Sequence, residues 1–394
     1  MIYKGKIGVD MTGGDVFKGK PILDRTTQYV LQAAKKYPNY LFCIAGPKDL
    51  ANLDWPTNVH HIHALQSHYF DVRKVTSEQN NQNTPLMQLL RNAEEEGLDA
   101  IVTHAKAKSI QQNTIKNPRD RQSIGLERIT GLRRPALVAL VPTVYEDKFV
   151  VMLDVGANYK NKNDELVQYA YLGSIIAEEL FGTKNPKVSA YNICEESDFG
   201  PPQYKELYQI LERDSEINFT GFMEDRHAIG LVEHLYNTER IAIPDVLIAE
   251  GFNGNEFIKV LQTGARLVEN VMKQEMFRNI IPGVSHLFNY ARAISFLRVK
   301  SRVSKRLKPD RFGGALFGGV KTRKNGNIVF IKGHGEADEG IFFGIERAIS
   351  YHEKQIMRKI NERMQRKLLA SPASVKSSEL VKLQKEICFL DAMP

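Results

Sequence analysis

The stretch Phe149-Val-Val-Met-Leu-Asp-Val-Gly-Ala-Asn158 decides the fold class. Five apolar residues end at Asp154, and a short turn that contains glycine follows them. Further along, Asp164–Leu180 repeats its apolar residues near helical spacing, which predicts a helix. Strand, turn and helix in this order form the repeating unit of an α/β sheet.

Two other turns have the same design. Asp10-Met-Thr-Gly-Gly-Asp15 follows the apolar run Lys6–Val9, and Glu250-Gly-Phe-Asn-Gly-Asn255 follows Val246–Ala249. Glycine between a strand and a helix exposes backbone N–H groups, which bind phosphate or an oxyanion, although glycine can also simply close a turn. Because ligands bind α/β sheets at the carboxyl ends of strands, we expect the three turns to build one anion-handling site.

The rest of the chain supports an α/β fold with a mostly parallel sheet. The further expected strands are Tyr40–Ile44, Ala100–Thr103, Pro135–Pro142, Val188–Ile193 and Ile328–Ile331, the last reached through a tight turn at Lys324–Asn327. The further expected helices are Leu23–Lys36, Thr84–Glu96, one long surface helix at Tyr351–Leu369 and a short one at Ser378–Leu390. We predict a single α/β domain over residues 1–350 and a helical extension over residues 351–394.

Composition excludes several classes of protein. The 394 residues are 42% hydrophobic and 25% charged, as in a globular protein. The three cysteines form no CxxC pair, so neither a disulfide framework nor a zinc site is expected, in keeping with a reducing cytoplasm. No stretch of about 18 uncharged apolar residues is present, so no transmembrane span is expected.

The net charge of +8 is concentrated in one segment, residues 271–308, which holds nine basic residues and one acid. Apolar residues recur there every three or four positions, as in a helix that lies on an anionic membrane. Its expected membrane contacts are Leu287, Phe288, Ile294 and Arg298. The alternative is a helix packed on the body or on a second subunit, with its basic face in water. No nucleic-acid motif accompanies the charge, so no nucleic-acid partner is expected.

Histidines offer one candidate for chemistry. His334 lies between two glycines, next to Lys332, and could donate to an anion or pass a proton. It could equally cap the helix expected at Glu339–Ile349. A metal site at His61 and His63 is disfavoured, because no carboxylate or cysteine lies close in the sequence.

These motifs, in this order, resemble the acyl-acyl-carrier-protein:phosphate acyltransferase family (PlsX) of bacterial phospholipid synthesis. The resemblance covers about residues 1–350. Its most specific part is Leu166-Val-Gln-Tyr-Ala-Tyr-Leu-Gly-Ser174 with the flanking turns. The other matching motifs are Arg134–Leu137, Asn185–Val188, Gly313–Gly318 and Lys332–Asp338.

The resemblance implies an isocitrate-dehydrogenase-like, three-layer α/β/α fold, a homodimer, and a cytoplasmic protein attached peripherally to the membrane. It implies transfer of a fatty acyl group from acyl carrier protein to inorganic phosphate, with no metal or organic cofactor. Asn255, Lys332 and His334 are the expected catalytic residues. The expected phosphate- and substrate-binding residues are Asp10, Gly13, Gly14, Asp15, Lys106, Lys108, Asp154, Gly156, Asn158, Glu250, Gly254, Gly335 and Asp338.

Two loops depart from the family pattern. A glycine-rich S-A-G-N-T-G-A loop is replaced by Thr103-His-Ala-Lys-Ala-Lys-Ser109, in which Lys106 and Lys108 could replace the lost backbone donors by their charge. A basic turn is replaced by Asp198-Phe-Gly-Pro201, and an aspartate by Glu250. Two alternatives therefore stay open: a non-catalytic or regulatory paralogue, and a phosphate acyltransferase that uses coenzyme A.

Overall fold

A computed structural model describes thirteen parts of the chain. They are residues 3–11, 20–46, 48–62, 89, 93, 97–103, 129, 131–145, 148–230, 243–278, 314–317, 328–331 and 339–370. The strands are β1 (Gly5–Asp10), β2 (Tyr40–Ala45), β3 (Val59–Ile62), β4 (Ala100–Thr103), β5 (Ala136–Pro142), β6 (Phe149–Leu153), β7 (Lys187–Tyr191), β8 (Asn218–Met223), β9 (Val246–Ile248), β10 (Gly314–Phe317) and β11 (Ile328–Ile331). The helices are α1 (Lys20–Lys36), the 3-10 helix η1 (Lys48–Asn52), α5 (Asn163–Phe181), α6 (Pro202–Arg213), α7 (Asp225–Ala228), α9 (Gly251–Arg278), α11 (Glu339–Glu353) and α12 (Ile356–Ala370).

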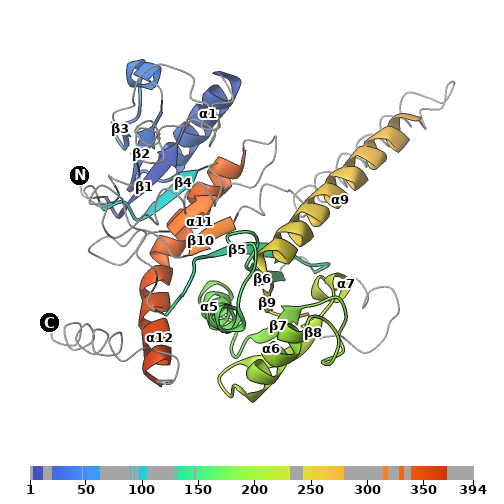
Figure 1. Cartoon of the computed structure of the whole chain (residues 1–394). Helices are drawn as coiled ribbons and strands as arrows, with labels where there is room; N and C mark the ends of the chain where they lie inside the picture. Colours follow the sequence, from blue (N-terminus) through green and yellow to red (C-terminus); the bar gives the residue numbers. More distant parts are fainter. Residues whose placement is uncertain are drawn as a thin grey trace, which may run out of the picture.

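The described strands form one sheet in the order β3-β2-β1-β4-β11-β10-β5-β6-β9-β7-β8. Seven of the neighbouring pairs are parallel, and three pairs, β11–β10, β10–β5 and β5–β6, are antiparallel. The prediction of a mostly parallel sheet is therefore confirmed. Figure 1 shows β1–β4 with α1 and α11 in one half of the molecule, and β6–β9 with α5, α6 and α7 in the other.

Both faces of the sheet carry helices. On one face, α1, α5, α6, α11 and α12 bury apolar side chains such as Val30, Tyr169, Leu207 and Ile345 in one continuous core. The opposite face of the β5–β9 region packs against α7 and α9 through Ala228, Phe257 and Ile258. The architecture is thus a three-layer α/β/α sandwich, and it sets the carboxyl ends of β6 and β9 beside α9.

The C-terminal helices correct one prediction. The expected single helix Tyr351–Leu369 is wrong: α11 ends at Glu353, and α12 begins at Ile356. Gln355, between them, has a φ of 53° in the left-handed region, which interrupts a helix. Ile356, Ile360 and Met364 are almost fully buried, so their four-residue spacing marks a core face and not a surface stripe.

Other expected elements are partly outside the described residues. Leu89 and Ala93 of the expected helix Thr84–Glu96 are buried together, four residues apart. The antiparallel pairing of β10 with β11 agrees with a hairpin, but its turn at Lys324–Asn327 lies outside the described residues. The same holds for the helix expected at Ser378–Leu390.

Candidate functional site

The turn after β6 is built around a buried carboxylate. Asp154 is fully buried, and it accepts hydrogen bonds from the N–H groups of Leu137 at 3.0 Å, Gly156 at 3.2 Å, Ala157 at 2.9 Å and Asn158 at 2.8 Å. The side-chain amide of Asn158 donates to the same carboxylate at 2.8 Å. Successive backbone N–H groups that point inward form an anion-binding nest. Here the anion is the Asp154 carboxylate itself.

This arrangement changes what the turn can do. Burial raises the pKa of Asp154 to about 6, and the hydrogen bonds from Ala157, Leu137 and Asn158 oppose the rise. The carboxylate is therefore ionised at neutral pH and holds the turn in shape. Because the N–H groups of Gly156 and Asn158 donate to Asp154, they do not point toward a ligand.

The turn after β9 packs directly against the turn after β6 through backbone atoms. A Cβ atom on Gly251 would lie 1.8 Å from the carbonyl oxygen of Asn158, and one on Gly254 would lie 2.1 Å from that of Asp154. No side chain fits at either position, so both residues must be glycine for the two turns to touch. The N–H of Gly254 donates to the carbonyl of Glu250 at 2.9 Å, so this glycine serves close packing.

Asn255, one of the expected catalytic residues, is placed beside the β6 turn by this contact. Its Oδ1 lies 3.3 Å from the position that a Cβ of Gly156 would take. Glu250, also in this turn, is buried and accepts a hydrogen bond from the side-chain amide of Gln203 on α6. The structure thus brings together six predicted site residues: Asp154, Gly156, Asn158, Glu250, Gly254 and Asn255.

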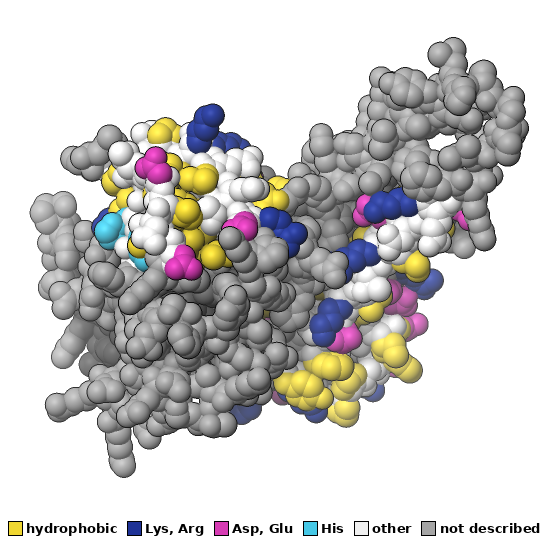
Figure 2. Space-filling view, turned by 90° about the horizontal axis from the view of Figure 1, so that it is seen from above, with side chains coloured by type: hydrophobic (Ala, Val, Ile, Leu, Met, Phe, Trp, Pro, Cys, Tyr) yellow, Lys and Arg dark blue, Asp and Glu magenta, His cyan; other side chains and the backbone are white. Residues whose placement is uncertain are grey.

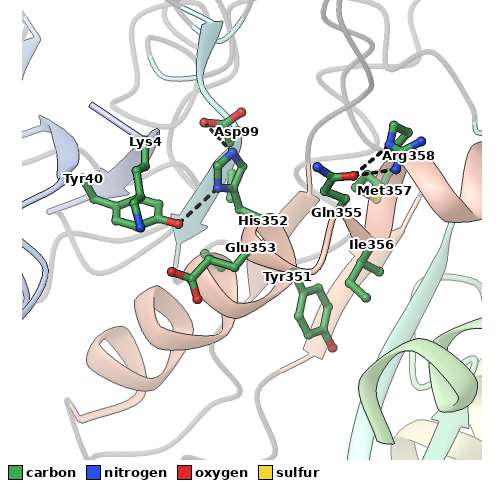
Figure 3. Close-up of a pocket in the computed structure, with 12 residues that line it drawn as sticks. Lys4, Tyr40, Asp99, Tyr351, His352, Glu353, Gln355, Ile356, Met357 and Arg358 are labelled. Carbon is green, nitrogen blue, oxygen red and sulfur yellow. Dashed lines mark hydrogen bonds and ion pairs between the residues drawn. The ribbon is translucent and has the colours of Figure 1, made fainter. Parts of the chain in front are cut away.

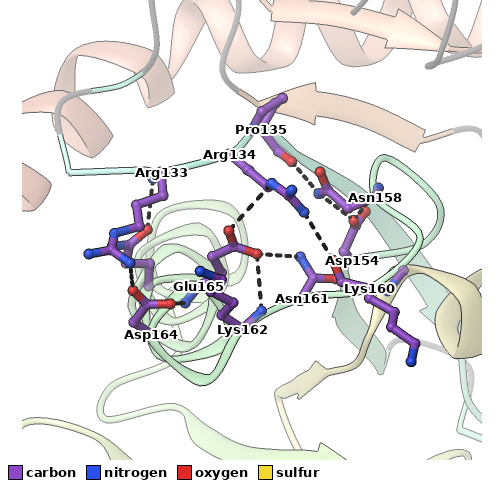
Figure 4. A network of polar contacts seen from close by, with 12 residues as sticks. Arg133, Arg134, Pro135, Asp154, Asn158, Lys160, Asn161, Lys162, Asp164 and Glu165 are labelled. Carbon is purple, nitrogen blue, oxygen red and sulfur yellow. Dashed lines mark hydrogen bonds and ion pairs between the residues drawn. The ribbon is translucent and has the colours of Figure 1, made fainter.

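A polar network behind the two turns fixes their relative position (Figure 4). The amide nitrogen of Asn158 lies 3.1 Å from the hydroxyl of Tyr169, and that of Asn161 lies 3.2 Å from the same hydroxyl. The Asn161 carbonyl oxygen accepts the N–H of Gly251 at 3.0 Å. A single residue, Asn161, therefore connects α5, the β6 turn and the start of α9.

The outer part of the network is ionic. Glu165, almost buried at the start of α5, lies 3.4 Å from Nε of Arg134 and 3.3 Å from the amide of Asn161. Arg134 also donates to the carbonyl of Lys160 at 3.0 Å. Its guanidinium is half-exposed and is held to the loop that follows the Asp154 turn.

Asn161, Tyr169 and Gly251 are site-building residues that sequence reasoning missed. Gly251 stands inside the quoted turn Glu250–Asn255, but no role was predicted for it. Asn161 lies just before α5 and Tyr169 lies within it, and nothing in their local sequence indicates that both reach the Asp154 turn. Only the contact between elements reveals that role.

The first predicted turn starts at another part of the sheet. Asp10, at the end of β1, is buried and accepts a hydrogen bond from the hydroxyl of Thr103 at 2.7 Å. Thr103 of β4 is paired in register with Ile331 of β11. β1, β4 and β11 are parallel neighbours, so the segments that follow Asp10, Thr103 and Ile331 leave the sheet at one shared edge.

Many predicted residues belong to these three segments or to the basic segment, and lie outside the described residues. They are Gly13, Gly14, Asp15, Lys106, Lys108, Leu287, Phe288, Ile294, Arg298, Lys332, His334, Gly335 and Asp338. For the first, second and last of these segments, the structure shows only that the strands before them, β1, β4 and β11, end side by side.

The three turns do not follow strands that end at one common edge of the sheet. Four strands, β4, β11, β10 and β5, separate β1 from β6, and the three antiparallel pairs reverse the direction of the chain between them. β6 and β9 run parallel to each other and opposite to β1. The rule that parallel strands share a carboxyl edge therefore joins the second and third turns but not the first.

A cavity of about 620 Å³ lies at the amino ends of β1 and β4, against α11 and α12 (Figure 3). Inside it, the hydroxyl of Tyr40 lies 3.2 Å from Nδ1 of His352, whose Nε2 lies 3.7 Å from the carboxylate of Asp99. No predicted site residue lines it. It is at the opposite end of β1 and β4 from Asp10 and Thr103, so it is separate from the candidate site.

Helix α9 projects from the body of the molecule (Figure 1). Its exposed apolar residues are Val260, Leu267, Val268 and Val271. In the right-hand half of Figure 2, hydrophobic side chains gather next to Lys, Arg, Asp and Glu side chains. Among the residues that the structure describes, no helix combines the length and hydropathy needed to cross a membrane. Within the same residues, no group of three or more His, Cys, Asp or Glu could hold a metal ion.

A family model described as fatty acid synthesis protein matches residues 5–359. A phosphate acyltransferase of Pseudoalteromonas atlantica is 27% identical over 375 residues, which cover 92% of this chain and 98% of that protein. One from Bacillus thuringiensis is 32% identical over 244 residues, covering 61% of this chain and 66% of that protein. A solved branched-chain phosphotransacylase from Enterococcus faecalis matches with a TM-score of 0.49 and 13% identity, covering 89% of this chain and 99% of that one.

Proposed function

This chain belongs to the family of fatty acid synthesis proteins, and on that premise we propose that it is a phosphate acyltransferase that moves a fatty acyl group from acyl carrier protein to inorganic phosphate. The observation that carries the proposal is the match over residues 5–359. Two relatives that each match over 92% of this chain, from Pseudoalteromonas atlantica and Bacillus cereus, are named phosphate acyltransferases. The interlocked turns at Asp154 and Gly251 support it, because they hold Asn255 in a fixed position.

The reaction needs few groups. An oxygen of phosphate attacks the thioester carbonyl carbon, the carbonyl oxygen becomes an oxyanion, and the C–S bond then breaks. The thiolate takes a proton, so the products are an acyl-phosphate and the free thiol of the carrier. We assign to the amide of Asn255 the hydrogen bond to the oxyanion, since a preorganised donor stabilises charge as it develops.

In this proposal, the half of the molecule that contains β1, β4 and β11 binds the phosphate. Gly13 and Gly14 would donate backbone N–H groups, and Lys332 with His334 would balance the negative charge. Their segments start at the same edge of β1, β4 and β11, which supports a shared role. The two lysines of the altered loop, Lys106 and Lys108, would add charge from the same edge. The carboxyl ends of β1, β4 and β11 lie at the opposite edge of the sheet from those of β6 and β9, so in this proposal the loops after them must bring the phosphate into contact with the thioester carbonyl that Asn255 holds.

The decisive assay uses purified protein, a long-chain acyl carrier protein and phosphate. We expect thiol release that depends on phosphate, with an acyl-phosphate detected by mass spectrometry. A reaction without phosphate is the control for simple hydrolysis. If no phosphate-dependent release of thiol occurs, the enzymatic proposal fails, and the result favours the non-catalytic or regulatory alternative. Release from acyl-coenzyme A but not from acyl carrier protein would favour the coenzyme-A-using alternative.

We also propose a homodimer and an anionic membrane surface as partners, with the acidic acyl carrier protein attracted by the basic segment. The projecting α9, with its exposed Val260, Leu267 and Val271, supports a contact surface that extends toward that segment. Replacing Leu287 and Phe288 with Asp should abolish flotation with anionic liposomes and leave the circular dichroism spectrum unchanged. Undiminished flotation would show that these residues are not the lipid contact.

A further inference from the structure

Two aromatic rings stand exposed on the interlocked turns. Tyr159 follows Asn158 and is 70% exposed, and Phe252 follows Gly251 and is 48% exposed. Their ring centroids lie 5.4 Å apart with an interplanar angle of 62°, a favourable edge-to-face contact. Large apolar side chains that lie together on the solvent-exposed surface, next to a candidate site, indicate a surface that binds an apolar ligand.

The base of this ring pair is rigid. The N–H of Phe252 donates to the carbonyl of Tyr159 at 3.2 Å, and the preceding N–H, of Gly251, donates to the Asn161 side chain at 3.0 Å. A Cβ on Gly251 would overlap the carbonyl oxygen of Asn158, so the backbones of the two turns are in direct contact. The rings therefore keep a fixed position relative to the Asp154 turn.

The ring pair also lies close to Asn255, the amide to which we assign the oxyanion contact. Phe252 and Asn255 are three residues apart in α9, and side chains at this spacing project from the same side of a helix. A carbonyl group that is held by the Asn255 amide thus lies on the side of α9 that carries Phe252, so a chain attached to that carbonyl can reach the rings.

Nearby surface agrees with an uncharged ligand. β7 runs parallel to β9, so the segment after β7 leaves the sheet at the same edge. That segment, residues 192–203, has three acids, Glu195, Glu196 and Asp198, and no Lys or Arg, and it exposes Ile193 and Phe199. Exposed apolar side chains beside acids, in a segment that has no cation, favour an aliphatic chain over a phosphate.

We propose that Tyr159 and Phe252 bind the aliphatic chain of the acyl donor and so determine its preference for long chains. The inference rests on the proposed function for the identity of the donor. A saturated chain gains free energy with every methylene group that it removes from water against the two rings.

The first test compares donor lengths. In the variant Tyr159→Ser/Phe252→Ser, KM for a hexadecanoyl donor should rise about tenfold, while KM for a butanoyl donor and for phosphate should stay unchanged. Leu53→Ser is the matched control, because Leu53 is 47% exposed, close to the 48% of Phe252, and lies just after η1 in the other half of the molecule. An equal effect on both donors, or no effect on either, overturns the proposal.

The second test does not need turnover. Titration calorimetry should detect binding of S-hexadecyl-pantetheine, an unreactive thioether, by the wild-type protein, and this binding should weaken about tenfold in the double variant. If the wild type binds the thioether but releases no thiol in the assay, the proposed function fails and this inference stands. If the wild type does not bind it, or if the variant instead changes the oligomeric state in light scattering, the rings have another role and the inference is overturned.

Discussion

At the scale of single residues, Asp154 is the centre of the candidate site, because its carboxylate collects five hydrogen bonds. Asp154→Asn should reduce the free energy of unfolding by about 2–4 kcal/mol, since the new NH₂ group would face N–H donors and leave them without an acceptor. Urea denaturation measures the change. Asp164→Asn is the control: this carboxylate is partly exposed beside Arg133, so its loss should cost at most about 1 kcal/mol. Equal losses in both variants would contradict the assigned role.

The same carboxyl group predicts a pH effect. Burial raises the pKa of Asp154 to about 6 from 3.8, so between these pH values the folded protein binds the proton more tightly than the unfolded chain does. The stabilisation from this group is therefore present at low pH and is lost as pH rises through 6. From pH 7 to pH 5, the stability gap between wild type and Asp154→Asn should widen by roughly 1–1.5 kcal/mol. A gap that narrows would mean that the hydrogen bonds outweigh burial and hold the pKa below 3.8.

Three glycines of α9 allow a matched comparison. Gly251→Ala and Gly254→Ala each place a Cβ about 2 Å from a backbone oxygen, so each should cost about 3 kcal/mol or more and disturb the Asn255 position. Gly264→Ala meets no atom within 4 Å, so it should stabilise the helix by roughly 0.5–1 kcal/mol. Thermal unfolding of the three variants distinguishes the two groups. Similar effects at all three positions would show that the turns are not interlocked.

At the scale of elements, α12 is part of the core although its sequence resembles a surface helix. Ile360 is fully buried, while Lys359 and Arg363 form half-exposed ion pairs with Glu179 and Glu178 of α5. Ile360→Ala should cost about 2–4 kcal/mol, and Lys359→Ala or Arg363→Ala about 0.5–1 kcal/mol each. Chemical denaturation gives the ranking, and a larger loss from either cation would indicate that charge and not packing holds α12 to the body.

The elements also show which parts of the fold could be predicted from the sequence. The strands around Asp154 and the helix predicted at Asp164–Leu180 were confirmed within one or two residues, because long apolar runs and regular spacing are strong local signals. α9 was missed: its first turn was interpreted as a loop, since glycine disfavours helix, and its end was grouped with the basic segment. α6 and β8 were missed because their apolar residues are few and interrupted.

At the scale of the whole molecule, the sequence located the six residues around Asp154 but not the relation between the two halves. Each turn was correctly assigned to the carboxyl end of its strand. The direction of each strand, however, depends on the antiparallel pairs β11–β10, β10–β5 and β5–β6, which are contacts between distant segments. Such pairing leaves no local pattern in the chain, so periodicity could not show that β1 and β6 run in opposite directions.

The division of the sheet leads to a prediction about ligand footprints. If phosphate is held at the β1–β4–β11 edge and the acyl donor at the β6–β9 edge, the two ligands should protect different segments from hydrogen exchange. Phosphate alone should protect residues 10–15 and 332–338, whereas S-hexadecyl-pantetheine should protect residues 154–163 and 250–256. Both together should protect all four segments, because the transfer requires the two ligands to meet. Asp154→Asn should lose the thioether footprint and keep that of phosphate, since the nest it disturbs belongs to the second edge only. If phosphate alone protects residues 250–256, the nucleophile binds at the Asp154 turn and the division between the two halves is wrong.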